Sequence, residues 1–220
     1  MVLSNSIQHS RIFKVTSQLL LTFTLTFGTL AATKMPAMAD APAPRNRLTI
    51  LEIRLLRDLI DGHNFAVQMS QVCVEKDIRE ELRSVCEQVI EAQQQEIQTM
   101  QSWLSNWYGI SYEPTPNNFS KNVLTQLESL NGSEFEIEFM KALTSHHWGA
   151  ILFGGEIIDR AYHNEFIELG SNVITEQVNE INQLRSMLLK FYGIQYNGAT
   201  GAGSSSVDPE EVLLAPGASR

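Results

Sequence analysis

The chain has 220 residues, 43% of them hydrophobic, and its 25 acidic and 16 basic side chains give a formal net charge of −9. This acidic balance argues against nucleic acids and anionic membrane surfaces as partners and favours cations. The length suffices for one domain with its own hydrophobic core.

The first 39 residues have the order of a secretory signal peptide. Arg11 and Lys14 precede the apolar run "LLLTFTLTFGTLAA", and a small-residue cleavage site follows at Ala37 to Ala39. The run is too short to favour a membrane span and holds no cysteine for lipid attachment. We therefore predict cleavage after Ala39 and a soluble, exported mature chain, in the periplasm or another extracytoplasmic compartment such as a lumen.

Cleavage there removes three basic residues and no acidic one. The mature chain then carries 13 basic and 25 acidic residues, a net charge of −12. Its attraction for cations is therefore stronger than that of the full chain.

An internal duplication spans most of the remaining sequence. The segment "VIEAQQQEIQTMQSWLSNWYGI", which ends at Ile110, aligns with "VITEQVNEINQLRSMLLKFYGI", which ends at Ile194, at an offset of 84 residues. Carried back without a gap, the same offset pairs His63 with His147. The folding unit is therefore present twice.

Each copy reads as a hairpin of two amphipathic helices, because apolar residues recur at helical spacing on both sides of a short polar turn. The patterns "TILE", Thr49–Glu52, and "SEFE", Ser133–Glu136, look like capping boxes that start the first helix of each copy. Gly109 and Gly193 look like helix stops. Two such hairpins without strand-like alternation predict an all-α, antiparallel four-helix bundle.

The predicted organisation follows from these signals. It comprises a signal peptide (1–39), an N-terminal linker (40–47), a first helical hairpin (48–110), a connection (111–132) with a short helix near 122–130, a second hairpin (133–194) and a disordered Gly-, Ala- and Ser-rich tail (195–220). The two hairpins form one domain.

The stretch "TSHHWGAI", residues 144–151, places two histidines inside a helix. At 100° per residue His146 and His147 fall within the apolar arc of that helix, whereas Trp148 points away from it. In the first copy Gly62 takes the position of His146. Both histidines are therefore expected to face the core or its flanks.

Polar residues also interrupt the apolar stripe on the second helix of each copy, at Gln93 and Glu96 and again at Gln177 and Glu180. A turn near residue 77 brings His63 level with Gln93, with Glu96 about one turn further along. The second copy repeats this arrangement. Each half is therefore expected to place His, Gln and Glu at mid-bundle, where a buried charge needs a partner or a metal.

Two stretches resemble the signature of a known family. "FMKALTSHHWGAI" in the second copy and "EELRSVCEQVIEAQQQEIQTMQSWL" in the first are similar to motifs of the domain of unknown function 305 family, DUF305, over about residues 48 to 194. The resemblance implies an exported, ferritin-like helical bundle, with copper binding or tolerance in several relatives. It also places candidate ligands at the histidine pair, at Met140 and, in the first copy, at Met69.

The departures from that signature limit the predicted metal content. Gly62 replaces one histidine, Phe153 replaces a methionine, and only four methionines remain in the predicted mature chain. Because soft thioethers select Cu(I), a store for many copper ions is disfavoured. One imidazole-based site in the second half is expected, for copper with zinc as the alternative. The candidate ligands are His146, His147, Met140, His63, Met69, Glu180 and Glu96.

A structural interpretation of the same residues stays open. Glu96 and Glu180 could accept hydrogen bonds from the histidines and form a polar layer without metal. His163, in the turn "AYHNEF", is assigned no role.

The two cysteines, Cys73 and Cys86, flank the first turn. Export favours a disulfide, but a height difference of about 6 Å between them, at 1.5 Å per residue, nearly exhausts the reach of one. Bridged and unbridged forms both remain open, and a two-thiolate metal site is disfavoured.

Three classes of function remain. The first is an exported, non-catalytic metal-binding protein, with copper as the leading ion. The second is a structural or interaction module without metal, which would use Trp148 or the aromatic helix ends for a protein partner or a homodimer. The third, a ferritin-like di-metal enzyme, is disfavoured because no Glu lies three residues before a histidine. No catalytic residue or organic cofactor is predicted.

Overall fold

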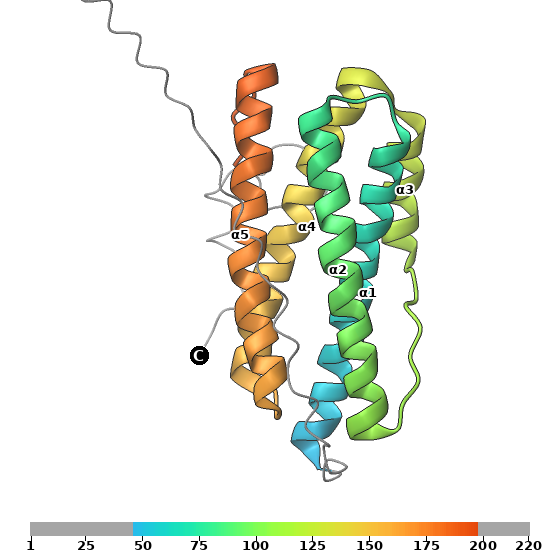
Figure 1. Ribbon diagram of the computed structural model, residues 1–220, viewed down its shortest axis with the longest axis vertical. Coiled ribbons are helices and arrows are strands. Elements are labelled where there is room, and N and C mark those ends of the chain that lie inside the picture. The colour runs from blue at the N-terminus through green and yellow to red at the C-terminus, as the bar shows by residue number, and fades with distance from the viewer. Residues whose placement is uncertain (1–45, 198–220) are drawn as a thin grey trace, which may run out of the picture. The chain divides into compact units, whose positions relative to one another are not determined.

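The computed structural model describes residues 46–197, which form five α-helices and no strand (Figure 1). The helices are α1 (Arg47–Glu75), α2 (Glu80–Tyr108), α3 (Asn118–Ser129), α4 (Gly132–Arg160) and α5 (Asn164–Tyr192). Neighbouring long helices run in opposite directions, and the short α3 lies beside α1. The predicted all-α, antiparallel four-helix bundle is confirmed.

The predicted signal peptide, the linker up to residue 45 and the tail from residue 198 lie outside the described residues. Between residues 46 and 197, no helix combines the length and the apolar character that a membrane span requires.

Both hairpins end at a glycine in the left-handed conformation, as expected. Gly109 and Gly193 have φ of 67° and 66°, a region that favours glycine because it lacks a Cβ. The amide of Ile110 then bonds the carbonyl of Leu104, which closes the last turn of α2, and Ile194 closes α5 in the same way.

The two predicted capping boxes are wrong. The capping box of α1 is made by Asn46 and Thr49, and α4 begins after Asn131 without a side-chain cap. The acidic residues of the two patterns, Glu52 and Glu136, are instead buried. They point into the bundle because each binds a turn of the other hairpin.

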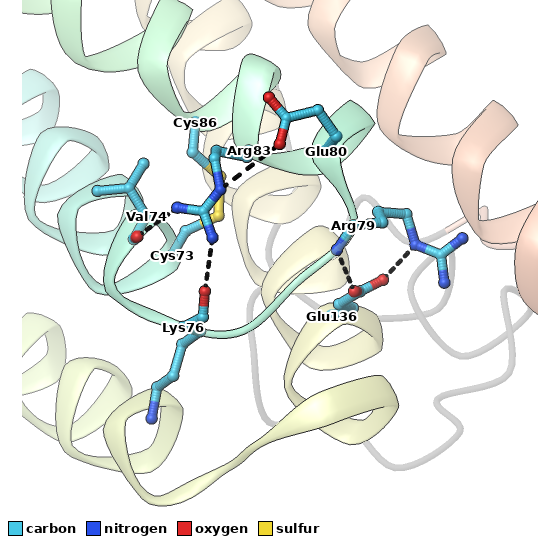
Figure 2. Close-up of a disulfide and its surroundings, with 8 residues drawn as sticks. All are labelled: Cys73, Val74, Lys76, Arg79, Glu80, Arg83, Cys86 and Glu136. Carbon is cyan, nitrogen blue, oxygen red and sulfur yellow. Dashed lines mark hydrogen bonds and ion pairs between the residues drawn. A yellow bond between two sulfur atoms is a disulfide. The ribbon is translucent and has the colours of Figure 1, made fainter.

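Glu136 on α4 binds the turn between α1 and α2 (Figure 2). Its carboxylate accepts the Arg79 backbone N–H at 2.9 Å, a bond from the Arg79 guanidinium, and the Tyr192 hydroxyl at 2.6 Å. Burial alone would raise the pKa of Glu136, but the bonds from Tyr192 and Arg79 outweigh it and lower the pKa. The carboxylate therefore stays charged and ties the hairpins together.

Glu52 on α1 makes the equivalent contacts at the opposite end of the bundle. Its carboxylate accepts the backbone N–H of Tyr162 at 2.6 Å and lies 3.0 Å from Nδ1 of His163. The His163 ring also stacks on Trp107, with centroids 3.8 Å apart. His163, which the sequence left without a role, is therefore a structural partner at the α4–α5 turn.

A disulfide joins Cys73 and Cys86 beneath the first turn (Figure 2). Their Cα atoms lie 6.3 Å apart, and both residues are fully buried. Arg83 covers the same turn by donating to the carbonyls of Val74 and Lys76. The bridged alternative is therefore the one that the structure contains.

The second hairpin has no disulfide at the equivalent place. The residues equivalent to the cysteines are Ile157 and Gly170. A Cβ added to Gly170 would come within 2.9 Å of the Ile157 side chain. Ile157 therefore fills the space that a side chain at position 170 would need, and α4 and α5 approach closely there.

Removal of the disulfide should destabilise the protein without changing its fold. A bridge between residues 13 apart closes a short loop, and its loss should cost about 3 kcal/mol because the unfolded chain gains entropy. Urea unfolding of Cys73→Ala/Cys86→Ala against the parent measures this cost. Equal midpoints for the two proteins would contradict the expectation.

Removal of the buried carboxylate at the first turn should also destabilise the fold. Glu136→Ala leaves Arg79 and Tyr192 without their acceptor, at an expected cost of about 3 kcal/mol. Glu138→Ala on the same helix is the matched control, because Glu138 is 39% exposed and pairs only with Lys141, which predicts a cost below about 1 kcal/mol. Similar losses in the two variants, measured by urea unfolding, would refute a special role for Glu136.

Candidate metal centre

Most of the predicted site residues gather in a polar layer halfway along the bundle. The buried apolar side chains form two separate clusters, one containing Met69 and Met140 and the other containing Met100 and Trp107. Between these clusters lies the mid-bundle layer, which we define as His63, Gln93, Glu96, His146, His147, Glu176, Gln177 and Glu180. The layer draws on α1, α2, α4 and α5, so its geometry depends on how the two hairpins dock.

In the first hairpin, His63 pairs with Glu96. Nε2 of His63 lies 2.8 Å from Oε2 of Glu96, with hydrogen-bond geometry. The side chain of His63 is 2% exposed and that of Glu96 15%. The pairing across the hairpin agrees with the position of the turn near residue 77, and it satisfies the buried imidazole.

In the second hairpin, His147 and Glu180 occupy the equivalent positions but interact less well. Nε2 of His147 lies 2.9 Å from Oε2 of Glu180. The angle does not make a hydrogen bond, however, so both of these atoms and Nδ1 of His147 lack a bonding partner. His147 is 0% exposed, and an unpaired buried imidazole is costly. Each half has a buried glutamine oxygen without a hydrogen-bond partner, at Gln93 and Gln177, but only the second half also has such a histidine.

His146 lies on the other side of α4, next to Gly62 of α1. Burial, together with the neighbouring His147 and His63, lowers the pKa of His146 to about 3, against a smaller opposite effect of the Gly62 backbone. The ring is therefore uncharged at neutral pH, and an uncharged imidazole keeps one nitrogen with a free lone pair.

The two adjacent histidines lie close enough to act together. Their ring centroids are 5.8 Å apart, and the His146 ring meets Phe65 edge to face at 5.3 Å. The order of the residues on α4 therefore brings two imidazole rings into one region of the layer.

Glu176 belongs to the layer although the sequence analysis did not select it. Burial, together with the nearby carboxylates of Glu96 and Glu180, raises its pKa to about 7, against a smaller opposite effect of His63. Glu176 lies four residues before Glu180, and this helical spacing is the signal that could have identified it. The first copy has Ala92 at the equivalent position, so the repeat comparison concealed it.

The two methionines do not join the histidines. Met69 and Met140 are fully buried in the same apolar cluster. Met140 precedes His146 by six residues, which is about 9 Å of helix rise. The structure therefore places both thioethers in the core, away from the layer.

A preformed three-ligand site is absent from the part of the chain that the structure describes. No three His, Cys, Asp or Glu side chains there lie close enough together to hold one ion. The donor set nevertheless fits a borderline metal, since it offers neutral imidazoles, a nearby carboxylate and the unpaired nitrogens of His147. Rotation of these rings would be needed to direct two nitrogens at one ion.

Replacement of Glu176 should stabilise the metal-free protein at high pH only. The folded pKa of about 7 exceeds the ordinary value of 4.5, so the folded parent loses stability as pH rises from about 4.5 to 7. Glu176→Gln removes this loss. Its free energy of unfolding should therefore exceed that of the parent by about 1 kcal/mol at pH 8, after allowance for solvent screening, and should equal it at pH 4. Urea unfolding at both pH values tests it, with the exposed Glu91→Gln as control; an equal gain at both pH values would contradict the pKa shift.

Comparison with known structures shows the same fold in other proteins. CopM in a Cu(I)-bound form has 21% sequence identity and a TM-score of 0.58, over 64% of this chain and 98% of CopM. A DUF305 fragment from Deinococcus radiodurans has 18% identity and a TM-score of 0.59, over 69% of this chain and all of the fragment. CopM has also been solved in a Cu(II)-bound form, at 20% identity and a TM-score of 0.57, over 64% of this chain and 97% of CopM. The comparison with curated proteins gave no match.

The family itself is settled by sequence. Residues 52–188, more than half of the chain, match the family described as Domain of unknown function (DUF305). This range covers most of both hairpins and every residue of the mid-bundle layer. The chain therefore belongs to the DUF305 family.

Proposed function

We propose that this protein is an exported copper-binding protein without enzymatic activity, and that His146 and His147 are its principal ligands. The observation that carries the proposal is the geometry of this pair: the His146 ring, whose pKa is lowered by burial, lies 5.8 Å from the buried ring of His147, whose Nδ1 has no hydrogen-bond partner and whose Nε2 lies 2.9 Å from an oxygen of Glu180. Glu180 and His63 are the nearest further donors.

Copper is favoured over zinc by the structural relatives. CopM, which shares the fold, has been solved with Cu(I), with Cu(II) and with silver. Imidazole ligands suit copper in both oxidation states and also suit zinc. The acidic chain, with a net charge of −9, would attract either cation.

The residues of the mid-bundle layer favour reversible binding of a metal ion over catalysis. No nucleophile with an adjacent base occurs among the candidate ligands. Met69 and Met140 would contribute to the stability of the core rather than to the ion. Export rests on the N-terminal sequence, with its charged start, apolar run and small-residue site.

A metal-independent interaction module is the second candidate. Leu152 on α4 is 76% exposed, one helical turn after the half-buried Trp148. Exposed apolar residues on one helix face are typical of contact surfaces for a protein partner or a second copy.

Copper titration of the mature protein, residues 40–220, tests the proposal. The parent should bind copper more tightly than micromolar, and His146→Ala/His147→Ala should weaken binding at least about tenfold. His163→Gln is the matched control, because His163 lies at the end of the bundle and should not affect the affinity. Thermal unfolding of each variant checks that the fold is kept.

Two outcomes would refute the copper site. One is a parent that binds neither Cu(I) nor Cu(II) at micromolar concentration, which would leave the interaction module. The other is a folded double variant with the affinity of the parent, which would move the site away from the histidine pair.

A further inference from the structure

A cavity of about 350 Å³ opens on the side of the bundle that carries α3. Its walls come from α1, from the segment that precedes α3, from the start of α3 and from one residue of α4. That residue is His146. The cavity thus connects the surface of the bundle with the mid-bundle layer.

His146 is the histidine of the layer that an ion could reach from this side. His63 is 2% exposed and His147 0%, whereas His146 is half-buried and lines the cavity. A bound ion would meet His146 first and His147 second, because the two rings are neighbours.

Gly62 keeps the His146 ring uncovered. The two positions are equivalent in the repeat, and they meet where α1 passes α4. A Cβ on Gly62 would lie 3.9 Å from Cε1 of His146, which is ordinary contact, but a longer side chain would extend across the ring. The absence of a side chain at Gly62 therefore leaves open the space through which His146 is reached.

The charge of the cavity suits a cation. Asp58 and Asp61 lie in its wall, and no Lys or Arg is among its lining residues. Asp58 pairs with Arg54 at 3.4 Å, on a part of α1 where both side chains are exposed. Clefts lined by one sign of charge raise the local concentration and the association rate of the opposite ion.

The roof of the cavity is held in place by Asp61. Its carboxylate accepts the Tyr112 hydroxyl and the Thr115 backbone N–H, both at 2.8 Å. These bonds fasten the segment between α2 and α3 over α1, so the cavity has a defined mouth. In its wall, Oε1 of Gln68 is buried and without a bonding partner.

We propose that this cavity, bounded by Gly62, Asp58 and Asp61, is the access route by which copper ions reach His146 from solvent. The inference rests on the proposed copper site. It adds a role for residues of the first hairpin, which lack a complete histidine pair of their own.

Association kinetics test the route. Cu(II) binding to the mature protein is followed by stopped-flow quenching of tryptophan fluorescence, since Trp148 lies one residue after His147. Gly62→Leu should slow association about tenfold by covering the ring, while Gly62→Ala, which adds only a methyl group in ordinary contact, should associate like the parent. Dissociation should slow with association, because ions leave by the same route.

A second variant keeps the test decisive if Gly62→Leu fails to fold. Asp58→Lys changes an exposed charge, so it should preserve the fold, yet it should slow association several-fold, most strongly at low ionic strength. Glu91→Lys makes the same charge reversal at an exposed residue of α2 outside the mid-bundle layer, so it is the matched control and should leave the rate unchanged.

The outcomes distinguish a wrong access route from a wrong copper site. Parent-like association in both Gly62→Leu and Asp58→Lys, or equal slowing in Asp58→Lys and the control Glu91→Lys, overturns the route and leaves the histidine site standing. Absence of copper binding in the parent, or unchanged affinity in His146→Ala/His147→Ala, overturns the proposed function and the route with it.

Discussion

The bundle depends on two buried carboxylates that each hold a turn of the opposite hairpin. Glu136 binds the backbone and side chain of Arg79, and Glu52 binds the backbone of Tyr162 and the ring of His163. Arg79 and His163 are equivalent residues of the duplicated unit, each at the start of its second helix. Because these bonds lie at opposite ends, they fix both the register of the hairpins and the position of the layer between them.

The candidate site arises where the two copies differ. The His–Glu pair is common to both, but His146 faces Gly62, and Glu176 has Ala92 as its counterpart. At the first of these positions one copy supplies the imidazole and the other a glycine that leaves room for it. A duplicated fold can thus hold an asymmetric site, since only one side chain fits where equivalent positions of the two copies meet.

Much of the fold and of the candidate site could be predicted from the sequence. The offset of 84 residues and the helical spacing predicted the two hairpins. They also predicted that four residues lie halfway along the bundle, namely His63, Glu96, His147 and Glu180. The roles of Glu52 and Glu136 were missed because a capping-box pattern is local, whereas their partners lie more than 50 residues away. The segregation of Met69 and Met140 into the core was likewise inaccessible, since helical phase does not reveal which inward residues share a level.

The exchange of carboxylates between hairpins also bears on the origin of the fold. Each hairpin carries both the acid that its partner's turn requires and the turn that its partner's acid binds. A single hairpin therefore has a self-complementary surface and is suited to assemble as a two-fold dimer. Fusion of two such hairpins through the segment that contains α3 would make that assembly independent of protein concentration and free each half to diverge.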